Sequence, residues 1–341
     1  MRVLITGGAG FIGSHLADAL LLRGNDVTII DDLSTGRPEN FAHVRHLPNF
    51  HFCIETIMNE VVMDRLVSEC DIIYHLASAV GVDLIVRKPV EVIERCILGT
   101  DMVLRIANRY KKKVLITSSS EIYGKNEKVP FNENDDRLLG PTTKSRWSYS
   151  CSKGIDEFLS LAYYKEKKLP IVIVRLFNTV GPRQTGQYGM VVPRFLEQAM
   201  RGEPITVFGD GSQKRCFTYV GDVVDAIIKL GNHAEAEGEI FNVGSTEEIS
   251  IADLAKKIKG TLSSSSEIVF VPYDEAYEEG FEDMPVRLPD LRKVESLINY
   301  KPKVVLDEII RKMYQYLHET KQQNDSGTST NVIPATFLQH N

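Results

Sequence analysis

A tyrosine and a lysine stand four residues apart in a stretch with helical periodicity, and this pair can support acid–base chemistry. Tyr149 and Lys153 precede the apolar residues Ile155 and Phe158, so they are expected one turn apart on one helix face. A phenol with its ordinary pKa of about 10 is a weak base at neutral pH, but a neighbouring ammonium group favours the phenolate. Tyr149 can then take a proton from a bound hydroxyl group.

Three polar residues upstream can complete such a site. Ser119, Ser120 and Glu121 follow Val114–Ile116, an apolar run of strand length. Ligands of open α/β sheets bind at the carboxyl ends of the strands, so Ser119 can orient the reacting hydroxyl there. Each residue type is also common in ordinary loops and helices, and the order of these residues after a nucleotide-binding loop is what favours a catalytic role.

That loop is predicted by a glycine-rich segment near the N-terminus. Gly7 precedes Gly8–Gly13, which reads G-x-G-x-x-G, and the segment follows the strand candidate Val3–Ile5. An amphipathic stretch after the loop predicts a helix that stops at Gly24. Glycines let the backbone approach a pyrophosphate at the positive N-terminus of such a helix.

An acidic residue after the next strand candidate favours NAD over NADP. Asp31 follows Val27–Ile30 and stands 18 residues after Gly13. A carboxylate at this place can accept hydrogen bonds from both ribose hydroxyls, and it would repel a 2′-phosphate.

The elements that must position these residues predict an α/β fold. Short apolar runs alternate with helical periodicity, as expected for a doubly wound, Rossmann-like parallel sheet whose strands are buried on both faces. The runs are Val3–Ile5, Val27–Ile30, Ile72–Leu76, Val114–Ile116 and Ile171–Val174. This NAD-binding domain is expected to span residues 1–178.

After Asn178 the chain changes to shorter pieces separated by glycine and proline. This change predicts a smaller C-terminal α/β portion for substrate binding over residues 179–321, partly interleaved with the first domain. Its strand candidates are Ile205–Phe208 and Ile268–Val271. Residues 322–341 are rich in Gln, Asn, Ser and Thr, so a flexible tail is expected there.

Composition excludes several classes of function. The 341 residues carry a net charge of −6, so the chain lacks the positive field that gathers nucleic acid or an anionic membrane surface. Five scattered cysteines form no metal-binding pattern, so no metal is expected and reduced thiols are the plain interpretation. No apolar stretch of membrane-spanning length occurs, and a cytoplasmic location is expected.

Separated motifs in the right order carry a family resemblance over residues 1–318. The chain resembles an extended short-chain dehydrogenase/reductase of the NAD-dependent epimerase/dehydratase family. Within that family it is most similar to UDP-glucuronate decarboxylases and UDP-apiose/xylose synthases. The matching segments are Ser119–Gly124, Arg146–Lys153, Gln213–Thr218, Gly280–Asp283 and Arg287–Asp290.

The resemblance implies roles for particular residues. Members of this family use bound NAD to oxidise C4 of a nucleotide sugar, here expected to be a UDP-sugar. The implied catalytic residues are Ser119, Ser120, Glu121, Tyr149 and Lys153. The implied NAD contacts are Gly7, Gly10, Phe11, Ile12, Gly13, Asp31 and Lys153. The implied substrate contacts are Asn178, Arg183, Arg215 and Arg287, since arginine offers a planar fork of donors to phosphate or carboxylate.

Several reactions can follow C4 oxidation. With a uronate, the C6 carboxylate becomes part of a β-keto acid and can leave as carbon dioxide, and Glu121 and Arg287 resemble the groups that line this carboxylate in the decarboxylases. UDP-glucuronate decarboxylation is therefore the leading hypothesis. A 4-epimerase acting on a UDP-hexose or UDP-uronate is the alternative, and a 4,6-dehydratase is third. A non-catalytic nucleotide-binding scaffold is the hypothesis from another class.

The chain also departs from the family pattern at two places. Glu55–Ile57 replaces the usual Gly-Asp-Ile that meets adenine, and Cys96 replaces an asparagine before Gly99 and Thr100, so the NAD contacts are expected to differ in part. The resemblance further implies a homodimer through helices near Cys96–Arg109 and Ser152–Tyr164.

Overall fold

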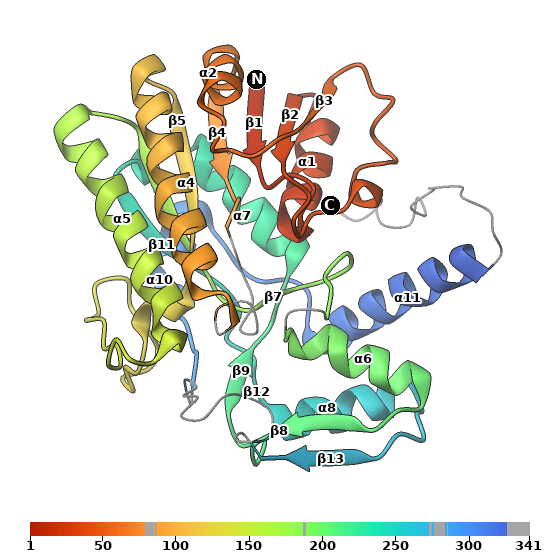
Figure 1. The fold of residues 1–341 in the computed structure, drawn as a ribbon. Coiled ribbons are helices and arrows are strands. Elements are labelled where there is room, and N and C mark those ends of the chain that lie inside the picture. The colour runs from red at the N-terminus through yellow and green to blue at the C-terminus, as the bar shows by residue number, and fades with distance from the viewer. Residues whose placement is uncertain are drawn as a thin grey trace.

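A seven-stranded parallel sheet organises the larger part of the molecule (Figure 1). The computed structural model describes residues 1–78, 87–186, 189–272 and 286–325, with Ile85, Glu275 and Met284. The strand order is β11-β6-β5-β4-β1-β2-β3. The strands are β1 (Arg2–Thr6), β2 (Asp26–Asp31), β3 (Phe50–Ile54), β4 (Ile72–His75), β5 (Lys113–Ser119), β6 (Ile171–Leu176) and β11 (Glu239–Val243).

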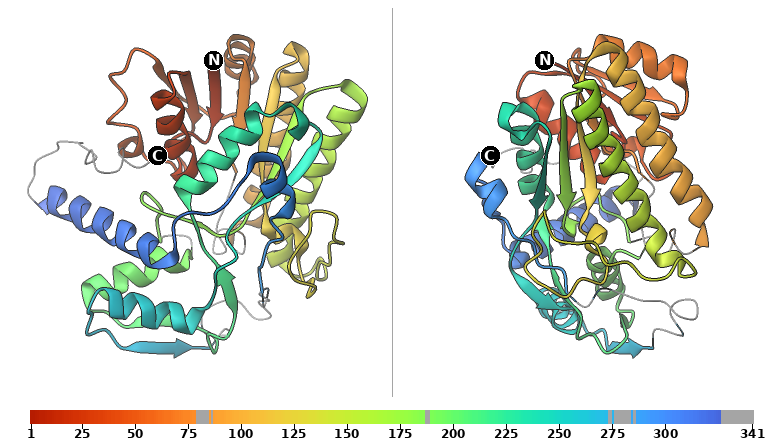
Figure 2. Two further views of the ribbon diagram at one scale, coloured as in Figure 1. Left: turned by 180° about the vertical axis from the view of Figure 1, so that it is seen from behind. Right: turned by 90° about the vertical axis from the view of Figure 1, so that its left-hand side faces the viewer.

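Helices cover both faces of this sheet, which confirms the doubly wound α/β fold (Figure 2). One face carries α1 (Phe11–Leu22), α7 (Val220–Asn232) and α10 (Arg292–Ile298). The other carries α2 (Glu60–Glu69), α4 (Pro89–Tyr110) and α5 (Ser148–Lys167). No helix among the described residues is both long enough and apolar enough to span a membrane.

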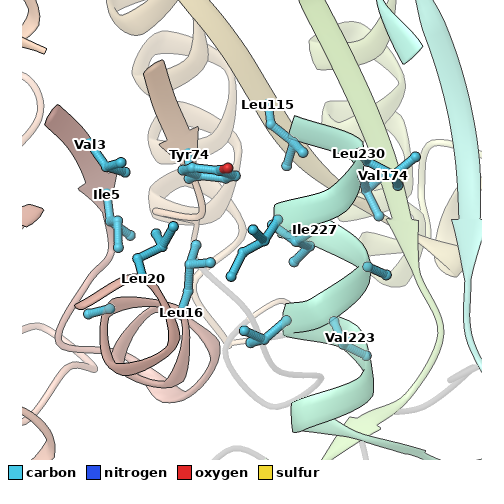
Figure 3. Close-up of a cluster of buried hydrophobic side chains, with 14 of the residues drawn as sticks. Val3, Ile5, Leu16, Leu20, Tyr74, Leu115, Val174, Val223, Ile227 and Leu230 are labelled. Atoms are coloured by element: carbon cyan, nitrogen blue, oxygen red, sulfur yellow. The ribbon is translucent and has the colours of Figure 1, made fainter. Parts of the chain in front are cut away.

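The core on the first face is built by α1 and α7 (Figure 3). Leu16 and Leu20 of α1 and Ile227 of α7 are fully buried and belong to one cluster with Tyr74 of β4. Full burial of each such leucine or isoleucine contributes about 1.5–3 kcal/mol to folding. This packing holds the first turn of α1 at the carboxyl edge of the sheet.

The predicted strands of the sheet are present, and two further strands were not predicted. β3 is an edge strand with only one buried residue, Phe50, so it lacks the apolar run that identifies a buried strand. β11 comes from residues after 178 and pairs in parallel with β6. Together with α7 and α10 it interleaves the second half of the chain with the first, and the domain boundary at 178 itself stays a prediction.

Within its described residues, the smaller C-terminal portion has its own buried cluster and three two-stranded sheets. The predicted strands at Ile205–Phe208 and Ile268–Val271 are β8 and β13, and they pair in parallel. The other strands are β7 (Thr179–Val180), β9 (Lys214–Cys216), β10 (Thr218–Tyr219) and β12 (Glu248–Ser250). The helices are α6 (Val191–Arg201), α8 (Ile251–Thr261) and α11 (Leu306–Asp325).

α11 extends into the segment expected to be a tail. Residues 322–325 are helical, because the chain has neither glycine nor proline to stop the helix before Gly327. Residues 326–341 and the motif Gly280–Asp283 lie outside the described residues. Short 3-10 helices complete the fold at η1 (Pro38–Asn40), η2 (Ser120–Tyr123), η3 (Ser145–Trp147) and η4 (Ala234–Ala236).

Strand order reverses between β1 and β4. From β1 the chain proceeds through β2 and β3 to one edge, and from β4 through β5 and β6 to the other. Neighbouring connections diverge at such a point and leave a crevice outside the carboxyl ends of the strands. Gly7, Gly10, Asp31 and Ser119, which are among the predicted site residues, lie where β1, β2 and β5 end at this edge.

Candidate active site

A cavity of about 580 Å³ lies at this edge and reaches the C-terminal portion. Its volume is in the usual range for small-molecule sites. It brings together nearly all the predicted site residues. Those on its wall are Gly7, Gly10, Phe11, Ile12, Gly13, Asp31, Ser119, Ser120, Glu121, Tyr149, Asn178, Arg183, Arg215 and Arg287.

The glycine loop approaches its own backbone too closely for side chains. Gly7 adopts φ +72 between β1 and α1, a conformation that favours glycine. A Cβ atom on Gly13 would lie 2.2 Å from the Gly7 carbonyl oxygen. The loop therefore presents bare backbone at the start of α1, where Phe11 and Ile12 line the cavity.

Asp31 supports this loop from the end of β2. Its two carboxylate oxygens accept hydrogen bonds from the Ala9 and Leu33 backbone N–H groups, each at 2.9 Å. Burial raises the pKa of Asp31, although the same backbone hydrogen bonds oppose the increase. Each oxygen can accept a further hydrogen bond, so the carboxylate can still bind ribose hydroxyls.

The two departures from the family pattern both lie by the cavity. Glu55, Thr56 and Ile57 line it, and the Glu55 carboxylate accepts hydrogen bonds from the Thr56 N–H group and the Asn59 side chain. Cys96 is buried against Tyr149, and its sulfur lies 3.3 Å from the Ser78 hydroxyl. Cys96 therefore packs behind the tyrosine instead of standing on the cavity wall described here.

Ser119 and Glu121 are joined at the end of β5. The Ser119 hydroxyl accepts a hydrogen bond from the Glu121 backbone N–H at 3.3 Å, and Ser120 between them is buried. The Glu121 carboxylate accepts one hydrogen bond from Arg146 and another, at 3.1 Å, from Arg287. Burial by itself would raise the pKa of Glu121, but the two guanidinium groups outweigh it and lower the pKa to about 2.

Tyr149 lies in the first turn of α5 and lines the cavity. It packs against Ile85 and Val92, and only 5% of the residue is exposed. Burial raises the pKa of Tyr149 well above its ordinary value, and the ammonium of Lys153 opposes that increase. Lys153 therefore acts in the expected direction, but burial outweighs it here, and the role of the pair as a base stays a prediction.

Lys153 itself is held away from the cavity. It is not among the described residues that line the wall, and its Nζ atom donates a hydrogen bond to Asp156 at 3.0 Å. Burial alone would lower the pKa of Lys153, but the nearby Asp156 carboxylate outweighs it and raises the pKa. A contact of Lys153 with NAD stays a prediction.

Asn178 and Arg215 border the C-terminal side of the cavity. The Asn178 side chain donates to the Cys216 carbonyl at 3.0 Å, which ties β9 to the loop after β6. Arg215 is buried and donates to the Lys214 carbonyl at 2.8 Å. Both residues are where the resemblance placed substrate contacts, and such contacts stay predictions.

Arg183, unlike Asn178 and Arg215, forms an ion pair with an acidic residue of α1. Its guanidinium donates to Asp18 of α1 at 2.6 Å, and Asp18 also bonds to His43 at 2.8 Å. Its backbone has φ +67, a left-handed conformation that costs a non-glycine residue about 1–2 kcal/mol. The ion pair offsets this cost and joins the NAD-binding helix to the substrate side.

Three charged residues at this site received no role from the sequence. Arg146 was quoted only as part of a motif, whereas Asp156 and Asp18 were not singled out at all. Helical spacing from Lys153 is a signal that could have identified Asp156. Nothing local in the sequence pairs Arg146 with Glu121 or Asp18 with Arg183, since these partners are 25 and 165 residues apart.

These features fit a dinucleotide. The glycine loop leaves no room for a Cβ atom at Gly13, and Asp31 offers carboxylate oxygens at the end of the neighbouring strand. A helix N-terminus stands between them, where a pyrophosphate is favoured. The acidic Asp31 fits NAD better than a 2′-phosphorylated dinucleotide.

Fold and site together define an extended short-chain dehydrogenase/reductase, with a doubly wound parallel sheet, a dinucleotide loop and a buried Tyr/Lys pair on one helix. The family described as GDP-mannose 4,6 dehydratase matches residues 4–313. The chain belongs to this family, which is of the NAD-dependent epimerase/dehydratase type, and the family prediction is confirmed.

Proteins similar to this chain have names that describe related reactions on UDP-sugars. A UDP-N-acetyl-alpha-D-glucosaminuronate decarboxylase of Bacillus cytotoxicus is 43% identical over 93% of this chain and 98% of its own length. UDP-glucuronic acid decarboxylase 1 of Danio rerio is 37% identical over 92% of this chain and 72% of its own. The structure of UDP-glucuronic acid 4-epimerase from Bacillus cereus, in complex with UDP-glucuronic acid and NAD, has a TM-score of 0.85 at 28% identity, covering 94% of this chain and all of that one.

Proposed function

We propose that this protein is an NAD-dependent decarboxylase of a UDP-hexuronate, with UDP-glucuronate as the leading substrate. The observation that carries the proposal is Glu121, ionised between Arg146 and Arg287 at the wall of a cavity that also holds Tyr149. Two guanidinium groups and one carboxylate leave a net positive charge, which favours a carboxylate on the substrate. The names of the two decarboxylase relatives support the same reaction.

NAD would be held by the glycine loop at the start of α1 and by the Asp31 carboxylate. Lys153 would join these contacts if its side chain turned from Asp156 toward the ligand. When bound, NAD would supply reversible hydride transfer at C4 of the sugar. The protein's own part is to move protons, hold the sugar and stabilise its charges.

Tyr149 is the proposed base for the C4 hydroxyl. Its phenolate would take the hydroxyl proton, and Lys153 stabilises that phenolate by its positive charge. The Ser119 hydroxyl, fixed by the Glu121 N–H group, would orient the sugar hydroxyl toward Tyr149. Both residues line one cavity, as this step requires.

Glu121 and Arg287 would act on the other end of the sugar. Once C4 is a ketone, the C5–C6 bond of the β-keto acid breaks, carbon dioxide leaves and the electron pair is delocalised as an enolate. Arg287 would bind the departing carboxylate as a charged, planar donor. A proton taken up at C5 from water then restores the ketone before C4 is reduced again.

A 4-epimerase is the second candidate, because the Bacillus cereus structure it resembles belongs to a UDP-glucuronic acid 4-epimerase. In that reaction the C4 ketone turns over in the cavity and receives hydride on its other face. Dehydration is third, since a dehydratase would use Glu121 to remove the C5 proton, and Ser120 stands where dehydratases usually carry an aspartate.

The deciding experiment is product analysis. Purified protein is incubated with NAD and UDP-glucuronate, and in parallel with its 2-acetamido analogue, and products are identified by mass spectrometry and proton NMR. We expect a UDP-pentose and released carbon dioxide from one of the two uronates. An isomer of unchanged mass from both would overturn decarboxylation and support 4-epimerisation.

We propose further that two copies associate through α4 and α5, which lie side by side at the edge of the molecule (Figure 2). Leu98 on α4 and Ile155 and Phe158 on α5 are exposed apolar residues, Phe158 to 68%. Exposed apolar groups on neighbouring helices favour association. A cytoplasmic location is proposed on the five cysteines, which are all free thiols.

A further inference from the structure

Arg146 is a buried charge whose own task in the proposed chemistry has not been assigned. It lies in η3, three residues before Tyr149, and is 2% exposed. Its Nη1 atom donates to Oε2 of Glu121, and its guanidinium carbon lies 5.7 Å from the centre of the Trp147 ring. A guanidinium group is costly to bury unless it is paired, so this contact has a strong energetic reason.

The two arginines on Glu121 occupy different positions relative to the cavity. Arg287 lines the cavity wall, whereas Arg146 is not among the described residues of that wall. Each binds a different carboxylate oxygen, Arg287 binding Oε1 and Arg146 binding Oε2. A ligand in the cavity can therefore reach Arg287 while Arg146 stays behind Glu121.

This arrangement addresses an electrostatic difficulty of the proposed function. A uronate carboxylate that approaches Arg287 meets the negative Glu121 at the same place. If Arg287 were the only cation there, its transfer to the substrate would leave Glu121 buried without a counter-ion, which is strongly unfavourable. Arg146 can remain paired and keep Glu121 ionised after Arg287 has turned to the ligand.

We propose that Arg146 is a positioning residue that holds Glu121 in place and thereby allows Arg287 to bind the substrate carboxylate. The inference rests on the proposed function, because it assumes an anionic sugar. It extends to Ser119, whose hydroxyl is held by the backbone N–H of Glu121. Arg146 thus connects η3, just before the Tyr149 helix, to Glu121 and Ser119 at the end of β5.

A variant of a neighbouring arginine, Arg137, can distinguish the proposed role of Arg146 from a purely structural one. Arg137 donates from Nε to the Ile122 carbonyl at 3.2 Å and from Nη2 to the Ser150 carbonyl at 2.9 Å. It joins η2 to α5, whereas Arg146 joins the adjacent η3 to η2 through Glu121, and none of the described contacts of Arg137 is to Glu121. Arg137→Gln is therefore a matched control for loss of a bridge between these elements.

The test measures binding apart from turnover. In the Tyr149→Phe background, the affinities of the NAD-saturated protein for UDP-glucuronate and UDP-glucose are measured by calorimetry. We expect Arg146→Gln to weaken UDP-glucuronate binding about tenfold or more, the value of one hydrogen bond to a charged group, with UDP-glucose changed less than about twofold. Arg146→Lys should retain part of the preference, and Arg137→Gln all of it.

Coupling to Glu121 is tested by a double-mutant cycle. With Glu121→Gln already present, Arg146→Gln should no longer change the preference for UDP-glucuronate, because its partner is neutral.

Two results would overturn the inference. Equal weakening of both ligands by Arg146→Gln, or the same loss of preference in Arg137→Gln, would make Arg146 a structural residue only. If Arg146→Gln does not fold, a folded Arg146→Met variant replaces it, and an unchanged preference for UDP-glucuronate in that variant would have the same meaning. Failure of the proposed function is distinct, because the wild-type protein would then release no carbon dioxide whatever Arg146 does.

Discussion

Lys153 and Asp156 form a buried ion pair within α5, with 3.0 Å between Nζ and Oδ2. Neither side chain is more than 3% exposed. The carboxylate lies beside the very ammonium group that favours the phenolate of Tyr149, so it offsets part of that effect. Asp156 is therefore expected to influence the acid–base behaviour of Tyr149 without touching it.

Asp156→Asn is predicted to lower the pKa of Tyr149, because Lys153 then acts on the phenol with its full charge. The acid limb of the pH–rate profile should move down by about one pH unit, as expected for a nearby charge. Glu157→Gln is the control, since Glu157 is a buried neighbour that pairs with Arg175. Both variants should lose thermal stability. An acid limb that does not move in Asp156→Asn would refute the prediction.

Tyr149→Phe should bind NAD and the UDP-sugar with nearly unchanged affinity, because only the proton-transferring hydroxyl is removed. Turnover should fall by about 10²–10⁴-fold, the usual contribution of a general base. Calorimetry and steady-state kinetics on the same preparation separate the two effects. Tyr163→Phe, on the same helix but outside the described cavity wall, should leave turnover unchanged. Full activity of Tyr149→Phe would exclude it as the base.

Asp31→Asn should weaken NAD binding by about tenfold, because a neutral amide accepts weaker hydrogen bonds from the ribose hydroxyls than a carboxylate does. NADP binding should weaken less or improve, since the repulsion of its 2′-phosphate is removed. Dissociation constants of both dinucleotides provide the readout. Asp26→Asn, at the opposite end of β2, is the control. An unaltered ratio of the two constants would contradict a role for Asp31 in selecting NAD.

The ion pair between Arg183 and Asp18 should make stability depend on pH. Burial by itself would raise the pKa of Asp18, but Arg183 and His43 outweigh it and hold the pKa below its ordinary value. The stabilisation is therefore complete above the unfolded-state pKa of about 4 and is lost as the pH falls below it.

Denaturant unfolding of the wild type and of Asp18→Asn at several pH values tests this pH dependence. The stability difference should be present at neutral pH and should shrink at pH values below about 4. Arg183→Met should lose the same dependence, because Asp18 then lacks its main counter-ion. A difference that is constant across this range would show that the charge of Asp18 does not contribute.

Phe158→Glu should dissociate the proposed dimer, because a carboxylate would be buried where an apolar ring is expected. Light scattering should give the dimer mass for the wild type and the monomer mass for the variant. Phe270→Glu is a matched control, since Phe270 is an exposed phenylalanine on β13, in the C-terminal portion. A monomeric wild type, or a Phe158→Glu dimer, would refute this interface.

The predicted NAD half of the site was recognisable because its signals are local. Gly7–Gly13 and Asp31 lie at the ends of two successive strands. The alternation of short apolar runs with helical periodicity predicts this strand–helix–strand order. By contrast, β3 was missed because an edge strand needs no continuous apolar run. β11 was missed because its partner β6 precedes it by more than 60 residues.

Local sequence patterns were enough to identify the residues that can do chemistry at the carboxyl edge of the sheet, because strand and helix periodicity act over a few residues. The pairing of the charges there follows from the packing of distant segments. Glu121 meets Arg287 across 166 residues, and Arg183 meets Asp18 across 165. These pairs depend on which distant segments are buried together, since burial makes an uncompensated charge costly and so selects its partner.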